Sequence, residues 1–390
     1  GSGNGGGNNG TGDKAAVGNL RISGSKNILV VGGGIAGLTA SLHMADAGAK
    51  VHLVEREHEL GGVARRLHYT LEGLDVQRLL ARLVRDVYRD PLIQVSHDAT
   101  VTDVSGYVGN FVTTLTSEGR IKRIEHGATV IATGAAEHRP TEYMYGEDGR
   151  VMTQLELEQR ISDGDAALDA ARTVVMIQCV GCRQPDRNYC ARICCNQAIK
   201  NALRLKERAP DLDLYILFRD MRTYGFAEDF YRAAAEREVR FVRFEPEAAP
   251  EVEPAEDDEG RSVVRVSVPD PVLGQRLAID ADLLVLSAAV VPSPGSLEAA
   301  RLFKVATNPD GFFQEAHVKL RPVDFAADGV FLCGTAHYPK HMCETISQAH
   351  GAAGRAASLL AQDTVTASGS VCEVREEACV ACGACITACT

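Results

Sequence analysis

The chain has 390 residues, 45% hydrophobic and 24% charged, which is enough for two or three domains with packed cores. Its formal net charge of −11 argues against a general nucleic-acid-binding protein, because such proteins neutralise phosphates with clustered Lys and Arg. No apolar run is long enough for a transmembrane helix, and no signal peptide is visible. We therefore expect a cytoplasmic protein that neither binds nucleic acid nor spans a membrane.

The alternation of short apolar strands with longer helical segments predicts a parallel α/β sheet. Residues 1–26, rich in Gly and Asn, are expected to be a linker, a tag remnant or a disordered leader without a role in the fold. The acidic stretch Glu245–Gly260 is expected to be a solvated loop. In chain order, the expected strands are Asn27–Val31, Lys50–Glu55, Thr129–Thr133, Thr173–Gln178, Leu212–Phe218, Val239–Phe244, Ala281–Leu286 and Gly329–Cys333, and the expected helices are Ile35–Ala47, Ala191–Arg208 and Glu344–Gln362.

A glycine motif, G-x-G-x-x-G, lies between the first strand and the first helix. Gly32 permits a tight turn, Gly34 lets the backbone approach a pyrophosphate, and Gly37 allows close packing of helix and strand. Glu55 ends the next strand, where a carboxylate can bind a ribose hydroxyl group. The strand, the helix and Glu55 together predict a dinucleotide-binding site rather than a purely structural turn.

Three further segments resemble FAD enzymes of the two-dinucleotide-binding flavoprotein group. The resemblance implies FAD in preference to NAD. Arg65 and Arg66 either meet an FAD phosphate or face solvent. The segments are Glu55-Arg56 followed by Gly61-Gly62, Ala132-Thr133-Gly134, and Gly329–Gly334.

The twelve cysteines fall mainly into two groups, with five between Cys179 and Cys195 and five between Cys372 and Cys389. Such clustering, with no secretory signal, indicates metal or redox chemistry in a reducing compartment. The first group lies where a pyridine-nucleotide disulfide reductase has its NAD(P)H glycine motif, of which only Gly181 remains. An iron–sulfur cluster is the preferred interpretation. A redox-active Cys179/Cys182 dithiol and a structural zinc site are the alternatives.

The chain resembles the A-type iron–sulfur flavoproteins of heterodisulfide reductase and their shorter bacterial relatives. That family carries FAD and an unusual 4Fe–4S cluster, and the resemblance implies Cys179, Cys190, Cys194 and Cys195 as its ligands. Cys182 is then a spare thiol or an alternative ligand. The segments that carry the resemblance are Thr153-Gln154-Leu155-Glu156, Gln178-Cys179-Val180-Gly181, Tyr189-Cys190-Ala191-Arg192-Ile193-Cys194-Cys195, and Pro339-Lys340 with Glu344-Thr345-Ile346.

The C-terminal cysteines have the C-x-x-C-x-x-C-x-x-x-C spacing of half a bacterial ferredoxin. Cys379, Cys382 and Cys385 are expected to bind a second cluster, with Cys389 or Cys372 as the fourth ligand. The alternative is a trimmed segment that lacks its partner ligands.

The segment after the last strand is expected to lie at the flavin. In the resembled family the following helix points its N-terminus at the flavin pyrimidine. Gly334 and Thr335 are therefore expected at the cofactor, with Lys340 tuning the flavin. Cys333 and Cys343 are expected to be buried small side chains, and His337, His341 and His350 are expected to pack or face solvent.

The sequence thus predicts an α/β, thioredoxin-reductase-like flavoprotein with two dinucleotide-binding domains. Its expected function is two-to-one-electron transfer within a heterodisulfide-reductase-like complex, with flavin-based bifurcation implied only by the resemblance. Expected partners are B/C-like, hydrogenase-like or quinone-linked subunits and a second copy of the chain. A self-contained disulfide reductase using Cys179/Cys182 and a non-catalytic scaffold remain as alternatives. The expected divisions are residues 27–150 and 281–365 for the FAD domain, 151–280 for an inserted cluster-bearing unit, and 366–390 for the ferredoxin-like segment.

Overall fold

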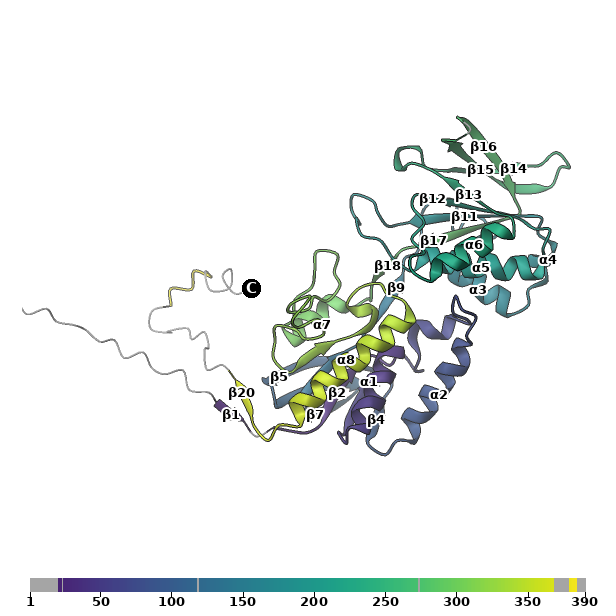
Figure 1. Cartoon of the computed structure of the whole chain (residues 1–390). Coiled ribbons are helices and arrows are strands. Elements are labelled where there is room, and N and C mark those ends of the chain that lie inside the picture. Colours follow the sequence, from purple (N-terminus) through teal and green to yellow (C-terminus); the bar gives the residue numbers. More distant parts are fainter. Residues whose placement is uncertain (1–19, 23, 118, 273, 368–378, 384–390) are drawn as a thin grey trace, which may run out of the picture.

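The computed structural model describes residues 20–22, 24–117, 119–272, 274–367 and 379–383 (Figure 1). These form two lobes, each built on a five-stranded parallel sheet. The α/β class expected from the sequence is confirmed. One short antiparallel pair joins β1 (Leu20–Ile22) to β20 (Val365–Ala367), so the leader expected to have no role in the fold contributes a strand.

The first sheet combines two distant parts of the chain. Its strand order is β19-β8-β2-β3-β4, so a late strand lies beside the early ones. β2 and β3 are almost wholly buried, as is usual for parallel strands covered on both faces. The strands are β2 (Ile28–Val31), β3 (Val51–Val54), β4 (Ile93–Ser96), β8 (Ala128–Ile131) and β19 (Val330–Leu332).

Helices cover one face of this sheet and an antiparallel sheet covers the other. On the helical face, buried alanines of α8 let it pack closely on α1, and the two run side by side in Figure 1. On the opposite face, Leu115, Ile124 and Phe303 share a core with the parallel strands. The covering elements are α1 (Ile35–Asp46), α2 (Val76–Arg89) and α8 (Met342–Leu360), then β5 (Ala99–Tyr107), β6 (Asn110–Ser117), β7 (Arg120–His126) and α7 (Ser296–Phe303).

The second sheet has the order β10-β17-β11-β12-β13 and a similar covering. The helices pack on one face, and Val264, Val266 and Ile279 of a three-stranded antiparallel sheet pack on the other. The elements are β10 (Val151–Thr153), β11 (Thr173–Val180), β12 (Asp213–Phe218), β13 (Val239–Arg243) and β17 (Leu283–Ala288), α3 (Gln154–Ser162), α4 (Ala166–Ala170), α5 (Cys194–Arg208) and α6 (Ala227–Glu236), and β14 (Glu251–Glu256), β15 (Ser262–Asp270) and β16 (Gln275–Ala281).

The expected loop over Glu245–Gly260 is wrong for its middle part, because β14 lies there. β14 pairs with β15 along six residues. It is an edge strand on which only Val252 and Ala255 are half-buried, so its acidic residues and Pro254 can face solvent without breaking a central ladder.

Two short strands, β9 (Ala135–Glu137) and β18 (Val290–Pro292), pair antiparallel between the lobes. β17 pairs with β10 and β11 and so belongs to the second sheet. We therefore propose that the second FAD-domain segment begins after Ala288 rather than at residue 281. Within the described residues, no helix combines the length and apolar character that a membrane crossing requires.

Candidate functional site

A cavity of about 2240 Å³ lies where the two lobes meet. It is larger than the roughly 300–1,000 Å³ typical of small-ligand pockets, which suits an extended dinucleotide. The glycine turn before α1 and the segment before α2 line it from the first lobe. The first turns of α3 and α5 and the β17–β18 connection line it from the second.

The glycine turn has the geometry that a bound pyrophosphate requires. Gly32 has φ +108°, and a Cβ there would lie 2.4 Å from the Ala132 carbonyl oxygen. A Cβ on Gly37 would lie 1.8 Å from the Gly32 carbonyl oxygen. Helix α1 can therefore pack this closely against the end of β2 only because residue 37 has no side chain. The nearest atom to a Cβ on Gly34, 4.0 Å away, is the Gly61 carbonyl oxygen. Gly34 caps α1 without a side-chain hydrogen bond, so the helix N-terminus faces the cavity unblocked.

Glu55 lies at this turn, but its first partners are backbone groups. One carboxylate oxygen accepts a hydrogen bond from the Gly33 N–H (2.6 Å) and the other from the Glu57 N–H (2.9 Å). Each oxygen keeps a lone pair for a ribose hydroxyl. Arg56 donates to the Pro294 carbonyl (2.8 Å), tying this corner to the segment after β18.

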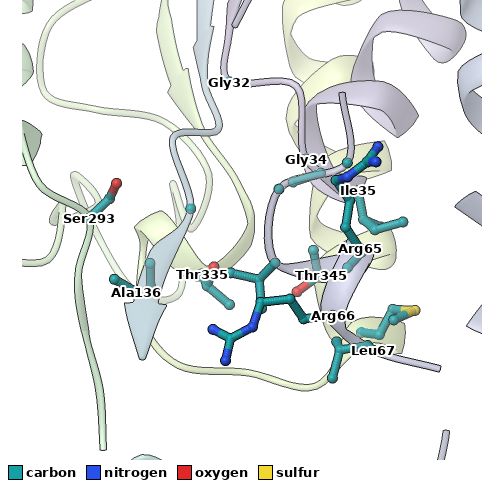
Figure 2. Close-up of a pocket in the computed structure, with 18 of the residues that line it drawn as sticks. Gly32, Gly34, Ile35, Arg65, Arg66, Leu67, Ala136, Ser293, Thr335 and Thr345 are labelled. Atoms are coloured by element: carbon teal, nitrogen blue, oxygen red, sulfur yellow. The ribbon is translucent and has the colours of Figure 1, made fainter. Parts of the chain in front are cut away.

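Arg65 and Arg66 both line the cavity and are about half exposed. Figure 2 shows Arg65 beside Gly34 and the Arg66 guanidinium turned toward the strand that carries Ala136. Arg66 donates to Glu137 (3.1 Å). Gly61 and Gly62 precede these arginines with positive φ angles of +124° and +52°. Ala132, Thr133 and Gly134 form the opposite wall.

The turn after β19 completes the cavity. Gly334 has φ +75°, and a Cβ there would lie 2.7 Å from the Ala36 Cβ. Thr335 and Lys340 line the cavity. The Lys340 ammonium donates to the Gly334 (2.6 Å) and Tyr338 (2.8 Å) carbonyls. Burial lowers the pKa of Lys340 to about 8.

These features fit FAD. Gly32 and Gly37 leave no room for side chains, and the α1 N-terminus at Gly34 is open. The Thr133 hydroxyl, also on the wall, is buried without a hydrogen-bond partner in the described part of the chain. Buried polar groups rarely stay unpaired, so a ligand atom is its natural partner.

The first cysteine group occupies the connection from β11 to α5. β11 shifts register between Ile177 and Val180. Cys179, Arg183 and Arg192 have left-handed backbones at φ +65°, +57° and +60°. Three such residues in one loop represent local strain, which proteins retain mainly at functional sites.

Four thiols of this group are buried together. Cys179, Cys182, Cys194 and Cys195 share one small cluster, and Cys190 beside them is only half-buried. Hydrogen bonding from the Cys182 thiol, and then Arg183 and Arg219, lowers the pKa of Cys179 to about 6 against the opposing effect of burial. The Arg192 N–H donates to the Cys190 sulfur (3.3 Å).

Several buried polar groups beside these thiols lack partners. Neither side-chain atom of Gln178 has a hydrogen bond within the described residues, although its side chain is buried, and the same holds for the Asn196 carbonyl oxygen and the Thr223 hydroxyl. Among residues the structure describes, no three His, Cys, Asp or Glu side chains are already close enough to hold a metal ion. The chemistry of these cysteines fits a metal group that is ligated by thiolates. In this structure the thiols form two hydrogen-bonded pairs, Cys179 with Cys182 and Cys194 with Cys195.

Helix α5 connects the thiols to the cavity. It begins at Cys194, three residues later than expected, and it presents Ile193, Asn196, Gln197 and Lys200 to the cavity wall. Sequence reasoning missed these residues. The signal was a mostly polar i, i+3, i+4, i+7 stripe directly after the cysteines, which indicates one helix face.

A buried ion pair joins α3 to α5 in the second lobe, and both of its members bind the backbone of the first lobe. The Lys200 ammonium lies 2.8 Å from a Glu158 carboxylate oxygen, and their side chains are 9% and 0% exposed. Lys200 also donates to the Tyr69 carbonyl (2.7 Å), and Glu158 accepts from the His68 N–H (2.7 Å).

Most of the second cysteine group lies outside the described residues, including Cys372, Cys385 and Cys389. Cys379 and Cys382 are exposed.

Cys333 is buried as expected, but the expectation for Cys343 is wrong, because its thiol is exposed near the start of α8. His337 packs between Glu315 (2.8 Å) and Gln348 (2.7 Å).

Comparison with known proteins defines the relationship. A family model described as pyridine nucleotide-disulphide oxidoreductase matches residues 26–177. The chain is 30% identical to the second A-type iron–sulfur subunit of CoB–CoM heterodisulfide reductase from Methanopyrus kandleri, covering 95% of this chain and 70% of the relative. It is 29% identical to the A-type subunit of the H2:CoB-CoM heterodisulfide,ferredoxin reductase from Methanothermobacter thermautotrophicus, covering 95% and 69%. Lactococcus lactis thioredoxin reductase shares the fold, with TM-score 0.59, 18% identity and coverage of 86% of this chain and 99% of that one. The predicted thioredoxin-reductase-like fold is thus confirmed.

Proposed function

The chain belongs to the A-type heterodisulfide reductase family of flavin oxidoreductases, and from this premise we propose that it is an electron-transfer subunit carrying FAD and a 4Fe–4S cluster. The observation that carries the proposal is the shared helix. α5 begins among the buried thiols and lines the dinucleotide cavity within its first two turns. The two candidate cofactor sites are therefore neighbours.

On this proposal, the first lobe binds FAD. Gly32, Gly34 and Gly37 leave space at the α1 N-terminus for the pyrophosphate, with Arg65 and Arg66 to neutralise it. The other groups that line or shape the site are Glu55, Arg56, Gly61, Gly62, Ala132, Thr133, Gly134, Gly334, Thr335 and Lys340.

Cys179, Cys190, Cys194 and Cys195 would ligate the cluster. The lowered pKa of Cys179 supports thiolate character at one of them, and the α5 N-terminus favours negative charge at Cys194 and Cys195. FAD exchanges electrons in pairs or singly and a 4Fe–4S cluster exchanges them singly, so the pair forms a two-to-one-electron junction. Arg183 and Arg219 hold positive charge beside the Cys179 thiolate.

The wider assignment follows from the family. We propose that the chain works with partner subunits of the B/C-like, hydrogenase-like or quinone-linked kind, that it forms a homodimer and that it is cytoplasmic. We also propose a second cluster at Cys379, Cys382, Cys385 and Cys389. Flavin-based bifurcation is part of the proposal only through the resemblance.

One observation favours a second candidate function. The hydrogen-bonded Cys179/Cys182 pair with a lowered Cys179 pKa has the properties of a redox-active dithiol. A disulfide reductase of this kind would not need iron.

Measuring the cofactor content decides between the iron–sulfur cluster and the redox-active dithiol. The chain is purified without oxygen, and iron, acid-labile sulfide and FAD are measured per chain. We expect about four irons per FAD for one cubane and about eight for two. Cys190→Ala should reduce the iron and sulfide content by about one cubane, whereas Cys343→Ala, at the exposed thiol outside both groups, should leave it unchanged. FAD without iron would overturn the cluster assignment and favour the dithiol.

A further inference from the structure

Helix α2 carries a row of arginines along one face. Arg78, Arg82, Arg85 and Arg89 follow the spacing i, i+4, i+7, i+11, which places them within a narrow stripe of a helix. Val76, Leu80 and Val87 lie on the opposite face and are buried against α1 and the first sheet. All four arginines are exposed.

The stripe is mostly unneutralised. Within the part of the chain that the structure describes, only Arg85 has an ion pair, with Asp86 (3.1 Å). Arg78, Arg82 and Arg89 form no salt bridge with any described residue. The stripe extends about 16 Å along the helix, on a chain whose net charge is −11. Such a local excess of positive charge, set in an acidic protein, steers anionic partners toward one place.

The stripe borders the dinucleotide cavity. Arg78, Arg82 and Arg85 line part of it, and α2 forms the outer flank of the first lobe (Figure 1). Exposed apolar side chains mark its two ends, with Leu74 67% and Tyr88 56% exposed. Arginine with a few exposed aromatic or aliphatic side chains is the composition typical of protein interfaces.

We propose that the α2 arginine stripe is the docking surface for an acidic one-electron carrier protein. This rests on the proposed electron-transfer function and adds to it the place and the charge of one partner. Charge complementarity selects an acidic surface, and three of the four arginines line the dinucleotide cavity, so a carrier docked here would lie at the edge of the proposed cofactor site. A nucleic acid fits less well, because the rest of this chain repels a long polyanion.

Binding of an oxidised acidic ferredoxin to the anaerobically purified holoprotein tests the proposal directly. Calorimetric titration of the double charge reversal Arg82→Glu/Arg89→Glu should show affinity at least tenfold weaker than that of the unmodified chain at low ionic strength. The difference should largely disappear at about 0.5 M salt, where surface charges are screened. The matched control is Arg120→Glu/Arg123→Glu on β7. It makes the same change in net charge on exposed arginines that form no salt bridge with the described residues, and it should bind as the unmodified chain does.

Three results would overturn the proposal. Equal affinity for the stripe variant and the unmodified chain would exclude this surface. Loss of FAD from the stripe variant would assign the arginines to cofactor retention. Dissociation of a dimer, or loss of binding to phosphatidylserine vesicles, with ferredoxin affinity unchanged, would assign the stripe to a second copy or to a membrane. The titration measures binding rather than turnover. Its result therefore still tests the docking surface if the cofactor measurements exclude the iron–sulfur cluster.

Discussion

The buried Glu158–Lys200 pair offers the sharpest test of how the two lobes are held around the cavity. The pair is almost inaccessible to solvent. Glu158→Gln would leave the Lys200 ammonium buried without its counter-charge, facing the carbonyl and the ring of Tyr69. Removing one partner of a buried ion pair typically costs about 3–5 kcal/mol, because the remaining charge has lost its water without compensation. We expect a loss of unfolding free energy in that range.

The double variant should recover most of this loss. Lys200→Met with Glu158→Gln leaves no buried charge, and the glutamine oxygen can still accept from the His68 N–H. Neutral replacement of a buried pair is often close to isoenergetic, so a coupling energy of at least about 2 kcal/mol is expected. Urea unfolding followed by circular dichroism measures it, since the chain contains no Trp to report by fluorescence.

An exposed pair provides the control. Arg172 and Glu259 lie 3.0 Å apart with both side chains 63% exposed. Glu259→Gln should cost at most about 1 kcal/mol. The reasoning is refuted if Glu158→Gln is as mild as Glu259→Gln, or if the effects of Glu158→Gln and Lys200→Met simply add in the double variant.

Three further predictions concern the cofactor site and pH. Gly37→Ala should abolish FAD retention, because its Cβ would lie 1.8 Å from the Gly32 carbonyl oxygen, whereas Gly354→Ala, with no atom within 4 Å, should retain FAD as judged by flavin absorbance after purification. Lys340→Met should lower the flavin reduction potential, measured by anaerobic redox titration, because a buried cation beside the cavity favours the anionic reduced flavin; an unchanged potential would exclude the tuning role. Burial lowers the pKa of His126 to about 4, so the unfolded chain binds more protons between pH 6.5 and 4. Stability should therefore fall as pH decreases through this window, with His126 contributing a loss of about 2 kcal/mol at pH 5, and His126→Gln should reduce that slope in urea titrations.

The sequence predicted best where the structure depends on local chemistry. The turn from β2 into α1 was readable because glycines at fixed spacing determine the backbone there. The β11 strand and the α5 helix were readable, to within a few residues, from a short apolar run followed by a helical pattern. The start of α5 was misplaced because Arg192 adopts φ +60°, and nothing in its side chain signals a left-handed backbone.

Features that depend on tertiary packing were not predictable in the same way. Glu158 and Lys200 are ordinary surface residue types, and their burial arises only when α3 and α5 meet the Tyr69 segment of the other lobe. β14 was missed because a solvent-facing edge strand can be as polar as a loop, and only its pairing with β15 distinguishes it.

On our proposal, the two lobes place negative charge at equivalent points by different means. In each, a buried strand leads into a helix whose N-terminus carries no side-chain cap. The first lobe has glycines there, which leaves the charge to be supplied by a phosphate group. The second lobe has Cys194 and Cys195 in the first turn, and on our proposal these side chains supply thiolate ligands there. On the same proposal, this turn holds a thiolate-ligated group in place of a nicotinamide dinucleotide. On our proposal, reducing equivalents therefore enter or leave the second lobe as single electrons through a thiolate-bound group.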